Sequence, residues 1–227
     1  MLPRKINQSP VPASAFGRAL ARMKEKREAA QRLVRIGFIV DATGSREHGW
    51  EQAQTVQGRM FDSVAGLGRV ALHLVHFGGN EITDHGWSED TTALAARMAA
   101  VRCRKGLTQI LPALRLFFSE EQVVAEALIL VGDAFEEDAR EIDFIAHHLK
   151  ARGTRVFSFF EGDNGAAEAA FRRIAEATGG RFARLGDDLP LGDLCAGVAL
   201  LTAGGEKAIR RLKNEQARKL LLTGPAK

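Results

Sequence analysis

From residue 36 the chain reads Ile36-Gly37-Phe38-Ile39-Val40-Asp41-Ala42-Thr43-Gly44-Ser45, an apolar run that ends in a turn with one carboxylate and two hydroxyls. The apolar part has the length and composition of a buried strand. Mg²⁺ prefers oxygen ligands in octahedral geometry at about 2.0–2.1 Å and keeps several waters. Asp41, Thr43 and Ser45 together therefore form part of a ligand set for a hard divalent cation.

The same three side chains also have a purely structural explanation. Asp, Thr and Ser oxygens accept hydrogen bonds from free N–H groups at helix starts, so the pattern taken alone is better explained as a helix cap. Two later segments favour the metal site: Thr108 lies where an amphipathic stretch begins, and Asp133 follows the apolar run 127–132. Ligands of open α/β sheets bind beyond the carboxyl ends of strands, where strand order reverses. We therefore expect the three segments to converge.

The order Asp-x-Thr-Gly-Ser, then Gly-x-Thr, then a strand ending in Asp resembles the metal-ion-dependent adhesion site (MIDAS) of von Willebrand factor A (VWA) domains. The resemblance covers roughly residues 33 to 203. It implies three hydroxyl ligands and two carboxylates that bind the ion directly or through water. Carried over, these metal-site residues are Asp41, Thr43, Ser45, Thr108 and Asp133. The pattern departs from the family at Leu107, where a glycine often precedes the threonine, and at 132–134, where Gly-Asp-Ala replaces Thr-Asp-Gly.

The resemblance also implies a function. It indicates a protein-protein interaction module, not an enzyme, that binds Mg²⁺, with Mn²⁺ or Ca²⁺ as substitutes. The ion would hold an Asp or Glu of a partner protein, because few anionic ligands leave the cation electrophilic. Intracellular bacterial members commonly work beside AAA+ ATPases in metal insertion or complex assembly. We therefore expect a cytoplasmic adaptor whose partner is an AAA+ ATPase or a protein encoded in the same operon.

Strands and helices are predicted to alternate along the chain. The predicted helices end at Gly153 and at Gly179-Gly180, which are typical stop signals. Alternation of this kind, with apolar runs buried on both faces, predicts a doubly wound α/β fold. It would have a mainly parallel six-stranded sheet with one antiparallel edge strand and helices on both faces. The predicted strands are 33–40, 70–77, 82–87, 127–131, 155–160 and 181–185, and the predicted helices are 12–33, 47–64, 90–101, 109–118, 138–152, 166–178, 191–201 and 206–222.

Composition and charge predict one domain with basic ends. The chain has 227 residues and 45% hydrophobic content, enough for a full core. Net charge is +7 over residues 1–35, −8 over 36–203 and +5 over 204–227. We divide the chain into a basic helical extension (1–32), a VWA-like domain (33–203) and a basic C-terminal helix (204–227). Cys103 and Cys195 lack metal-type spacing, and no apolar stretch approaches the ~20 residues of a membrane span.

Two other functions remain open. Asp41-Ala42-Thr43-Gly44-Ser45 also resembles the nucleophile loop of haloacid-dehalogenase-like phosphotransferases, with Asp133 and Asp138 as their metal motif, although that spacing is one residue too long. The basic ends are compatible with a nucleic-acid-associated factor, although neither end interleaves aromatic residues with its charges. The histidines offer no metal pair by spacing, since residues three apart in a strand, such as His73 and His76, face opposite sides.

Overall fold

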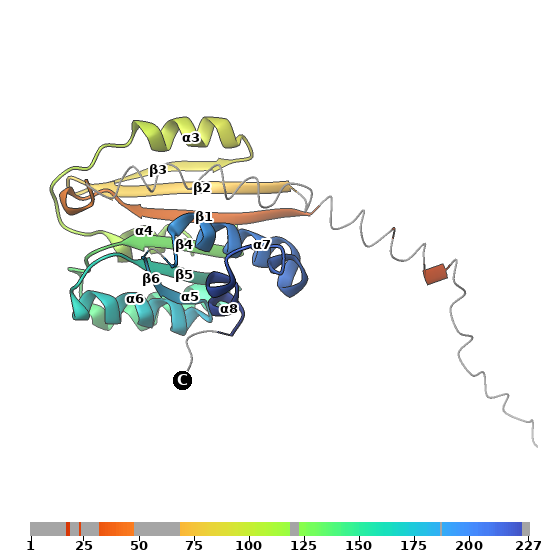
Figure 1. Cartoon of the computed structure of the whole chain (residues 1–227). Coiled ribbons are helices and arrows are strands. Elements are labelled where there is room, and N and C mark those ends of the chain that lie inside the picture. Colours follow the sequence, from red (N-terminus) through yellow and green to blue (C-terminus); the bar gives the residue numbers. More distant parts are fainter. Residues whose placement is uncertain are drawn as a thin grey trace, which may run out of the picture.

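The computed structural model describes residues 17–18, 23, 32–47, 69–118, 123–186 and 188–223. Its centre is a six-stranded sheet in the order β3-β2-β1-β4-β5-β6, in which only β3 runs antiparallel to its neighbour (Figure 1). The predicted doubly wound α/β fold is therefore confirmed. The strands are β1 (Leu33–Asp41), β2 (Arg69–Gly78), β3 (Glu81–Ser88), β4 (Ala127–Gly132), β5 (Arg155–Phe160) and β6 (Phe182–Arg184).

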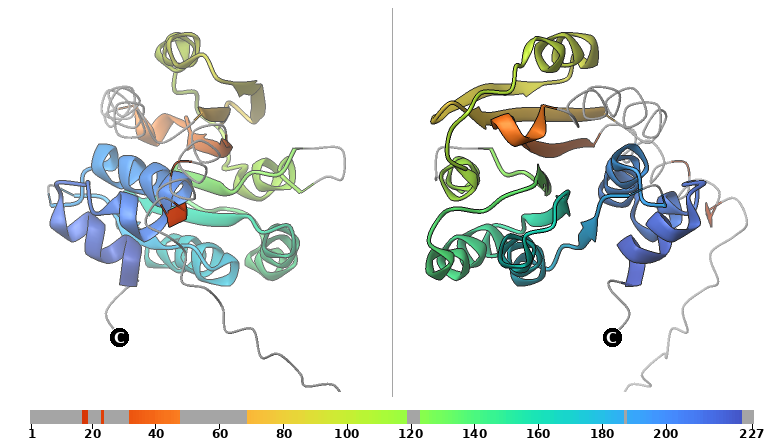
Figure 2. Two further views of the ribbon diagram at one scale, coloured as in Figure 1. Left: turned by 90° about the vertical axis from the view of Figure 1, so that its right-hand side faces the viewer. Right: turned by 60° about the vertical axis from the view of Figure 1, so that its left-hand side comes forward.

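Helices cover both faces of the sheet. In the right view of Figure 2, α7 and α8 lie on one side, and α4 and α5 lie on the other. All six residues of β4 are buried, as expected of a central strand between two helical layers. The helical elements are η1 (Gly44–Arg46), α3 (Thr91–Ala100), α4 (Ile110–Arg115), η2 (Ala139–Glu141), α5 (Ile142–Ala151), α6 (Gly165–Thr178), α7 (Leu191–Ile209) and α8 (Glu215–Thr223).

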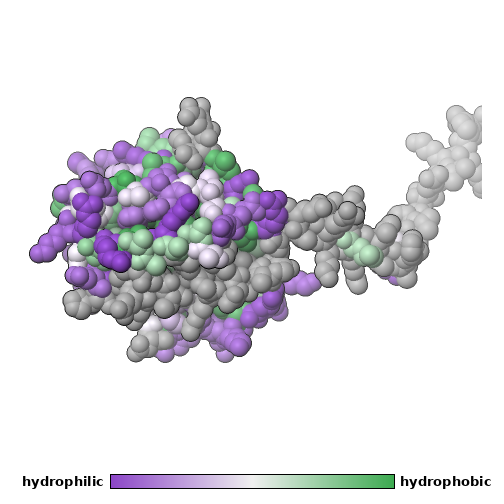
Figure 3. Space-filling model, turned by 90° about the horizontal axis from the view of Figure 1, so that it is seen from above, coloured by the Kyte–Doolittle hydropathy of each residue, from purple (hydrophilic) through white to green (hydrophobic). Residues whose placement is uncertain are grey.

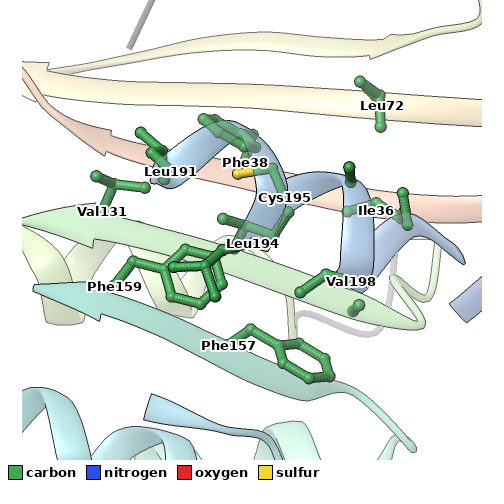
Figure 4. Close-up of a cluster of buried hydrophobic side chains, with 14 of the residues drawn as sticks. Ile36, Phe38, Leu72, Val131, Phe157, Phe159, Leu191, Leu194, Cys195 and Val198 are labelled. Carbon is green, nitrogen blue, oxygen red and sulfur yellow. The ribbon is translucent and has the colours of Figure 1, made fainter. Parts of the chain in front are cut away.

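The sheet separates two hydrophobic cores. The α7-side core joins α3, α7 and α8 to one face of the strands, and the α5-side core joins α4, α5 and α6 to the other. Alternate residues of one strand enter different cores, as the period of two requires. Figure 4 shows the α7-side core, where the start of α7 packs on β1, β4 and β5. The labelled side chains of α7 there are Leu191, Leu194, Cys195 and Val198.

The predicted elements agree with the structure in most of the described chain, with three exceptions. The helix expected over 191–201 continues as α7 to Ile209, across a kink at Gly205, where φ is 63° and ψ is −159°. The helix expected over 109–118 ends at Arg115, because the next three N–H groups donate to carbonyls three residues back and tighten the chain into a turn. The single helix expected over 206–222 is wrong. It is interrupted at 210–214, where Asn214 Oδ1 accepts a hydrogen bond from Ala217 N and starts α8. That helix packs on α7 and buries Ala217 and Leu221.

Several expectations lie outside the described residues. These are most of the N-terminal extension and most of the helix expected over 47–64. The three-part division of the chain stays a prediction. Cys195 is buried, Cys103 is half-exposed, and both are free thiols. Within the described part of the chain, no helix is long and apolar enough to cross a membrane.

Gly180 has no room for a side chain. A methyl group there would lie 1.8 Å from the carbonyl oxygen of Val156. This oxygen belongs to the backbone of β5 and cannot move without shifting the strand. We expect Gly180→Ala to lower the free energy of unfolding by about 3 kcal/mol or more, measured by urea denaturation. Gly165→Ala is the matched control, because nothing lies within 4 Å of its added methyl group. A Gly180→Ala variant as stable as the Gly165→Ala variant would contradict this packing.

Candidate metal site at the carboxyl ends of β1 and β4

Two carboxylates lie at the ends of adjacent parallel strands. Asp41 is the last residue of β1, Asp133 directly follows β4, and the two strands pair in register up to Val40 and Val131. The chain leaves β1 towards β2 on one side and later returns to β4 on the other, so this is where the strand order reverses. Gly132 lets the two strand ends pack closely, since a methyl group there would lie 2.9 Å from Phe171 Cζ and 3.2 Å from Asp41 Cβ.

Each of these carboxylates has one oxygen without a hydrogen-bond partner in the described part of the chain. Asp41 Oδ1 accepts a hydrogen bond from Thr43 N at 2.7 Å, but Asp41 Oδ2 and Asp133 Oδ1 are buried and unpaired. Leaving a buried acceptor unsatisfied costs about 1–3 kcal/mol, and more for a charged group. Two such oxygens at neighbouring strand ends fit a cation ligand set better than a purely structural role.

Burial makes ionised Asp41 costly. Its side chain is fully buried, and desolvation raises its pKa from 3.8 to about 6. The hydrogen bonds from Thr43 oppose this shift, the charge of Asp133 adds to it, and the charge of Arg46 opposes it. A cation bound between the two carboxylates would favour the charged form of both.

Thr43 and Ser45 bring two hydroxyls beside Asp41. Thr43 Oγ1 lies 3.2 Å from Ser45 Oγ, with Thr43 buried and Ser45 exposed. Thr43 occupies the N-cap position of η1, yet its side chain makes no capping hydrogen bond there. The helix-cap explanation therefore does not account for the Thr43 hydroxyl at η1, and its oxygen is available as a ligand.

Thr108 is tied to the loop that follows Asp133. Thr108 Oγ1 donates to Glu137 Oε2 at 2.6 Å and accepts from Glu136 N at 2.9 Å. A hydroxyl oxygen has two lone pairs, so one is left for a metal. The segment before Thr108 is in turn fixed to the end of β1, because Arg104 N donates to Ala42 O at 2.9 Å. Hydrogen bonds thus connect the three predicted segments.

Sequence reasoning missed two residues of this region. Glu137 directly precedes the helix predicted over 138–152, but it accepts hydrogen bonds from Ile110 N and Leu111 N and so caps α4. Arg46 is almost fully buried and forms an ion pair with Glu161 beyond β5. The guanidinium makes no hydrogen bond to the unpaired oxygens of the two aspartates. Neither role has a sequence signal, because both partners are distant in the chain.

The donor set suits a hard cation. Among the described residues, no three His, Cys, Asp or Glu side chains gather where they could hold a metal. Binding here would consequently depend on hydroxyl oxygens as well as on the two carboxylates, as Mg²⁺ with its retained waters allows. The residues present fit such an ion.

No protein-family model matches the sequence, and no curated protein matches it either. Solved structures do match its fold. The VWA domain of SpRpn10 superposes with a TM-score of 0.59 at 11% identity, covering 76% of this chain and 98% of that one. The BatB protein of Bacteroides thetaiotaomicron gives 0.57 at 16% identity, with 79% and 98% covered. Proximal thread matrix protein 1 of the mussel byssus, described with a zinc-occupied MIDAS motif, gives 0.56 at 17%, with 77% and 46% covered.

The raised pKa of Asp41 predicts a pH effect on stability without metal. The pKa of Asp41 is about 6 in the folded chain and 3.8 in the unfolded chain. Its contribution to the free energy of unfolding is therefore full below about pH 4 and is lost as the pH rises through about 6. The loss amounts to roughly 2–3 kcal/mol. His76, whose pKa is lowered to about 4, acts in the opposite direction. We therefore expect the stability difference between Asp41→Asn and the wild type to grow by this amount from pH 4 to pH 7, measured by urea denaturation in EDTA. A constant difference would contradict the shift.

Proposed function

The chain has the fold of von Willebrand factor A domains, and we propose that it is a divalent-metal-dependent protein-protein interaction module. The observation that carries this proposal is the pair of buried, unpaired oxygens, Asp41 Oδ2 and Asp133 Oδ1, at adjacent strand ends. The structural relatives support an interaction fold, and the mussel protein shows that such a fold is found with an occupied MIDAS motif.

Five side chains would hold the ion. Asp41 and Asp133 provide the negative charge, directly or through water, and Thr43, Ser45 and Thr108 provide neutral oxygens. Bound there, Mg²⁺, or Mn²⁺ or Ca²⁺ in its place, supplies an electrophilic coordination position that a carboxylate from another protein can complete. Hydrogen bonds to Glu136 and Glu137 position Thr108 for this role.

The surface around this position has features that a partner would contact. Leu107, directly before Thr108, is 62% exposed, and its N–H is held by Asn80 Oδ1 at 2.8 Å. Ser45 is exposed on the other side of the same loop pair. An acidic side chain flanked by an apolar one is the chemistry that fits this rim. We propose a cytoplasmic adaptor or assembly role, with an AAA+ ATPase or an operon-encoded protein as partner.

Affinity capture tests this function. The full chain, immobilised and exposed to lysate with Mg²⁺ or with EDTA, should retain a partner only with the metal, and mass spectrometry identifies it. Asp41→Asn should lose that partner in both conditions. Asp143→Asn is the matched control, because Asp143 is exposed on α5 and bonded to Arg173, outside the site. A partner retained equally by Asp41→Asn in EDTA would refute metal-dependent recognition.

The phosphotransferase alternative is less well supported. It needs Asp138 as a further metal carboxylate, but that side chain accepts hydrogen bonds from the backbone and guanidinium of Arg140 at the start of η2. These bonds lower the pKa of Asp138 to about 2. Its position is that of a surface helix cap. A covalent aspartyl-phosphate on Asp41 after treatment with a phosphoryl donor would reverse this preference.

The nucleic-acid alternative depends on the chain ends. Of the basic C-terminal residues, Lys207, Arg210, Arg211 and Lys213 are exposed around the end of α7. Steep salt dependence of DNA or RNA binding that disappears when residues 205–227 are removed would favour this alternative.

A further inference from the structure

The β2–β3 hairpin brings together two histidines that sequence spacing does not pair. His85 Nε2 lies 3.0 Å from His76 Nδ1. The ring centroids are 5.1 Å apart, and the ring planes differ by only 23°. The distance between the centroids exceeds the distance between the two nitrogens by about two ring radii. The rings therefore meet edge to edge, with one nitrogen of each pointing at the other. Both side chains are half-buried and remain in contact with solvent.

A β-bulge aims His85 at this position. The pairing of β2 with β3 shifts between His73 and Val75, where His85 and Gly86 lie opposite a single residue of β2. Gly86 adopts a φ of 68°, which favours glycine. Without the extra residue, His85 and Trp87 would share a face of the sheet. With it, Trp87 packs against the α5-side core, and His85 turns to the opposite face.

The face that receives the pair is the side of α3. His76 shares its strand face with Leu72 and Leu74, which belong to the α7-side core together with residues of α3. Arg97 of α3 fixes the hairpin by donating to the His85 carbonyl at 2.9 Å. Figure 3 views the molecule from this side, and hydrophilic residues predominate on the part that is coloured. Because both rings are half-buried, an ion can reach the pair from solvent.

Two neutral imidazoles joined in this way share one proton between two nitrogens. Burial lowers the pKa of His76 to about 4, and burial together with the charge of Arg97 lowers that of His85. At neutral pH one ring donates an N–H and the other accepts it. A metal ion in place of that proton would bond to both nitrogens, while the second nitrogen of each ring carries the remaining proton.

We propose that His76 and His85 form a two-imidazole site for a divalent transition ion of the Zn²⁺ class. Tetrahedral Zn²⁺ with Zn–N distances of 2.0–2.1 Å needs nitrogens about 3.3 Å apart, close to the 3.0 Å found. Imidazole suits Zn²⁺, Cu²⁺ and Ni²⁺, whereas Mg²⁺ and Ca²⁺ prefer oxygen ligands. No third His, Cys, Asp or Glu joins the pair among the described residues, so water or another molecule fills the other positions.

Zinc titration of the full chain in excess Mg²⁺ tests this site separately from the one at β1 and β4. Calorimetry should show one Zn²⁺ bound by the wild type. His76→Asn and His85→Asn should each weaken that binding at least about tenfold, since even losing a group that only orients a metal ligand costs that much. His147→Asn is the matched control, because its ring meets that of its neighbour at 82° with centroids 6.0 Å apart. Asp41→Asn should retain the zinc site.

Two results of the zinc titration would contradict the proposed site. Zinc binding that is unchanged in both His76→Asn and His85→Asn, or that disappears in Asp41→Asn, would overturn the proposal. Should either histidine variant unfold, nitrogen NMR of the wild type decides. Zn²⁺ should then shift His76 Nδ1 and His85 Nε2, and unshifted signals would refute the site. Failure here leaves the Mg²⁺ site untouched, and failure of that site leaves this one untouched.

Discussion

Asp41→Asn is expected to weaken Mg²⁺ binding strongly while making the metal-free chain more stable. The change removes one of two ligand charges, so affinity should fall on the order of 100-fold. Asparagine keeps an oxygen that can accept the hydrogen bond from Thr43 N. It also avoids the cost of a buried carboxylate whose pKa burial raises to about 6. At pH 7 that cost is roughly 2–3 kcal/mol.

Calorimetric Mg²⁺ titration and urea denaturation in EDTA measure the two effects. Opposite signs are informative, because a variant that merely misfolds would lose metal binding and stability together. Asp138→Asn serves as the control, since Asp138 is exposed and bonded to Arg140, and it should leave Mg²⁺ binding unchanged. Wild-type Mg²⁺ affinity in Asp41→Asn would contradict the assigned ligand set.

Glu137→Ala is expected to have the second large effect. One carboxylate serves four donors, the hydroxyl of Thr108 and the N–H groups of Glu136, Ile110 and Leu111. Removing it leaves the start of α4 uncapped and the loop around Thr108 without its anchor. We expect the free energy of unfolding to fall by about 2–4 kcal/mol. Mg²⁺ affinity should fall as well, because Thr108 would keep its hydrogen bonds to Glu136 but lose the one to Glu137 that orients its hydroxyl.

The matched control for this change is Glu141→Ala. Glu141 forms an ion pair with Arg115 of the same helix α4, but both side chains are about half exposed. Exposed pairs of this kind contribute about 0–1 kcal/mol. Urea denaturation should therefore separate the two variants clearly. Equal stability of Glu137→Ala and Glu141→Ala would show that the hydrogen bonds of Glu137 contribute little.

Local patterns predicted the sheet well, and the reason is physical. Strands buried on both faces need continuous apolar runs, and each of the six predicted strands lies within one residue of an observed one at both ends. The helix expected over 206–222 is interrupted in the structure because the Asn214 side chain begins a new helix. The same side chain also donates to the Asp188 carbonyl and to Asp193 Oδ2.

In the candidate site, too, local sequence patterns predicted some residues and missed others. Asp41 and Asp133 follow apolar strands, so the topology of a parallel sheet predicts that they lie near each other. The capping of α4 by Glu137 depends on a loop 26 residues away from Leu111, which no local pattern reveals. The histidine pair depends on a single extra residue in β3. A prediction that assumes strict alternation of side chains along the strand does not detect this residue. Tertiary contacts, not composition, set these features.

A crystal of the full chain soaked in Mn²⁺ and measured at its absorption edge tests the central claim most directly. The account predicts one strong anomalous peak between the ends of β1 and β4, within bonding distance of oxygens from Thr43, Ser45 and Thr108 and beside Asp41 and Asp133. A map with no peak there, or with the guanidinium of Arg46 turned from Glu161 into that space, would contradict it.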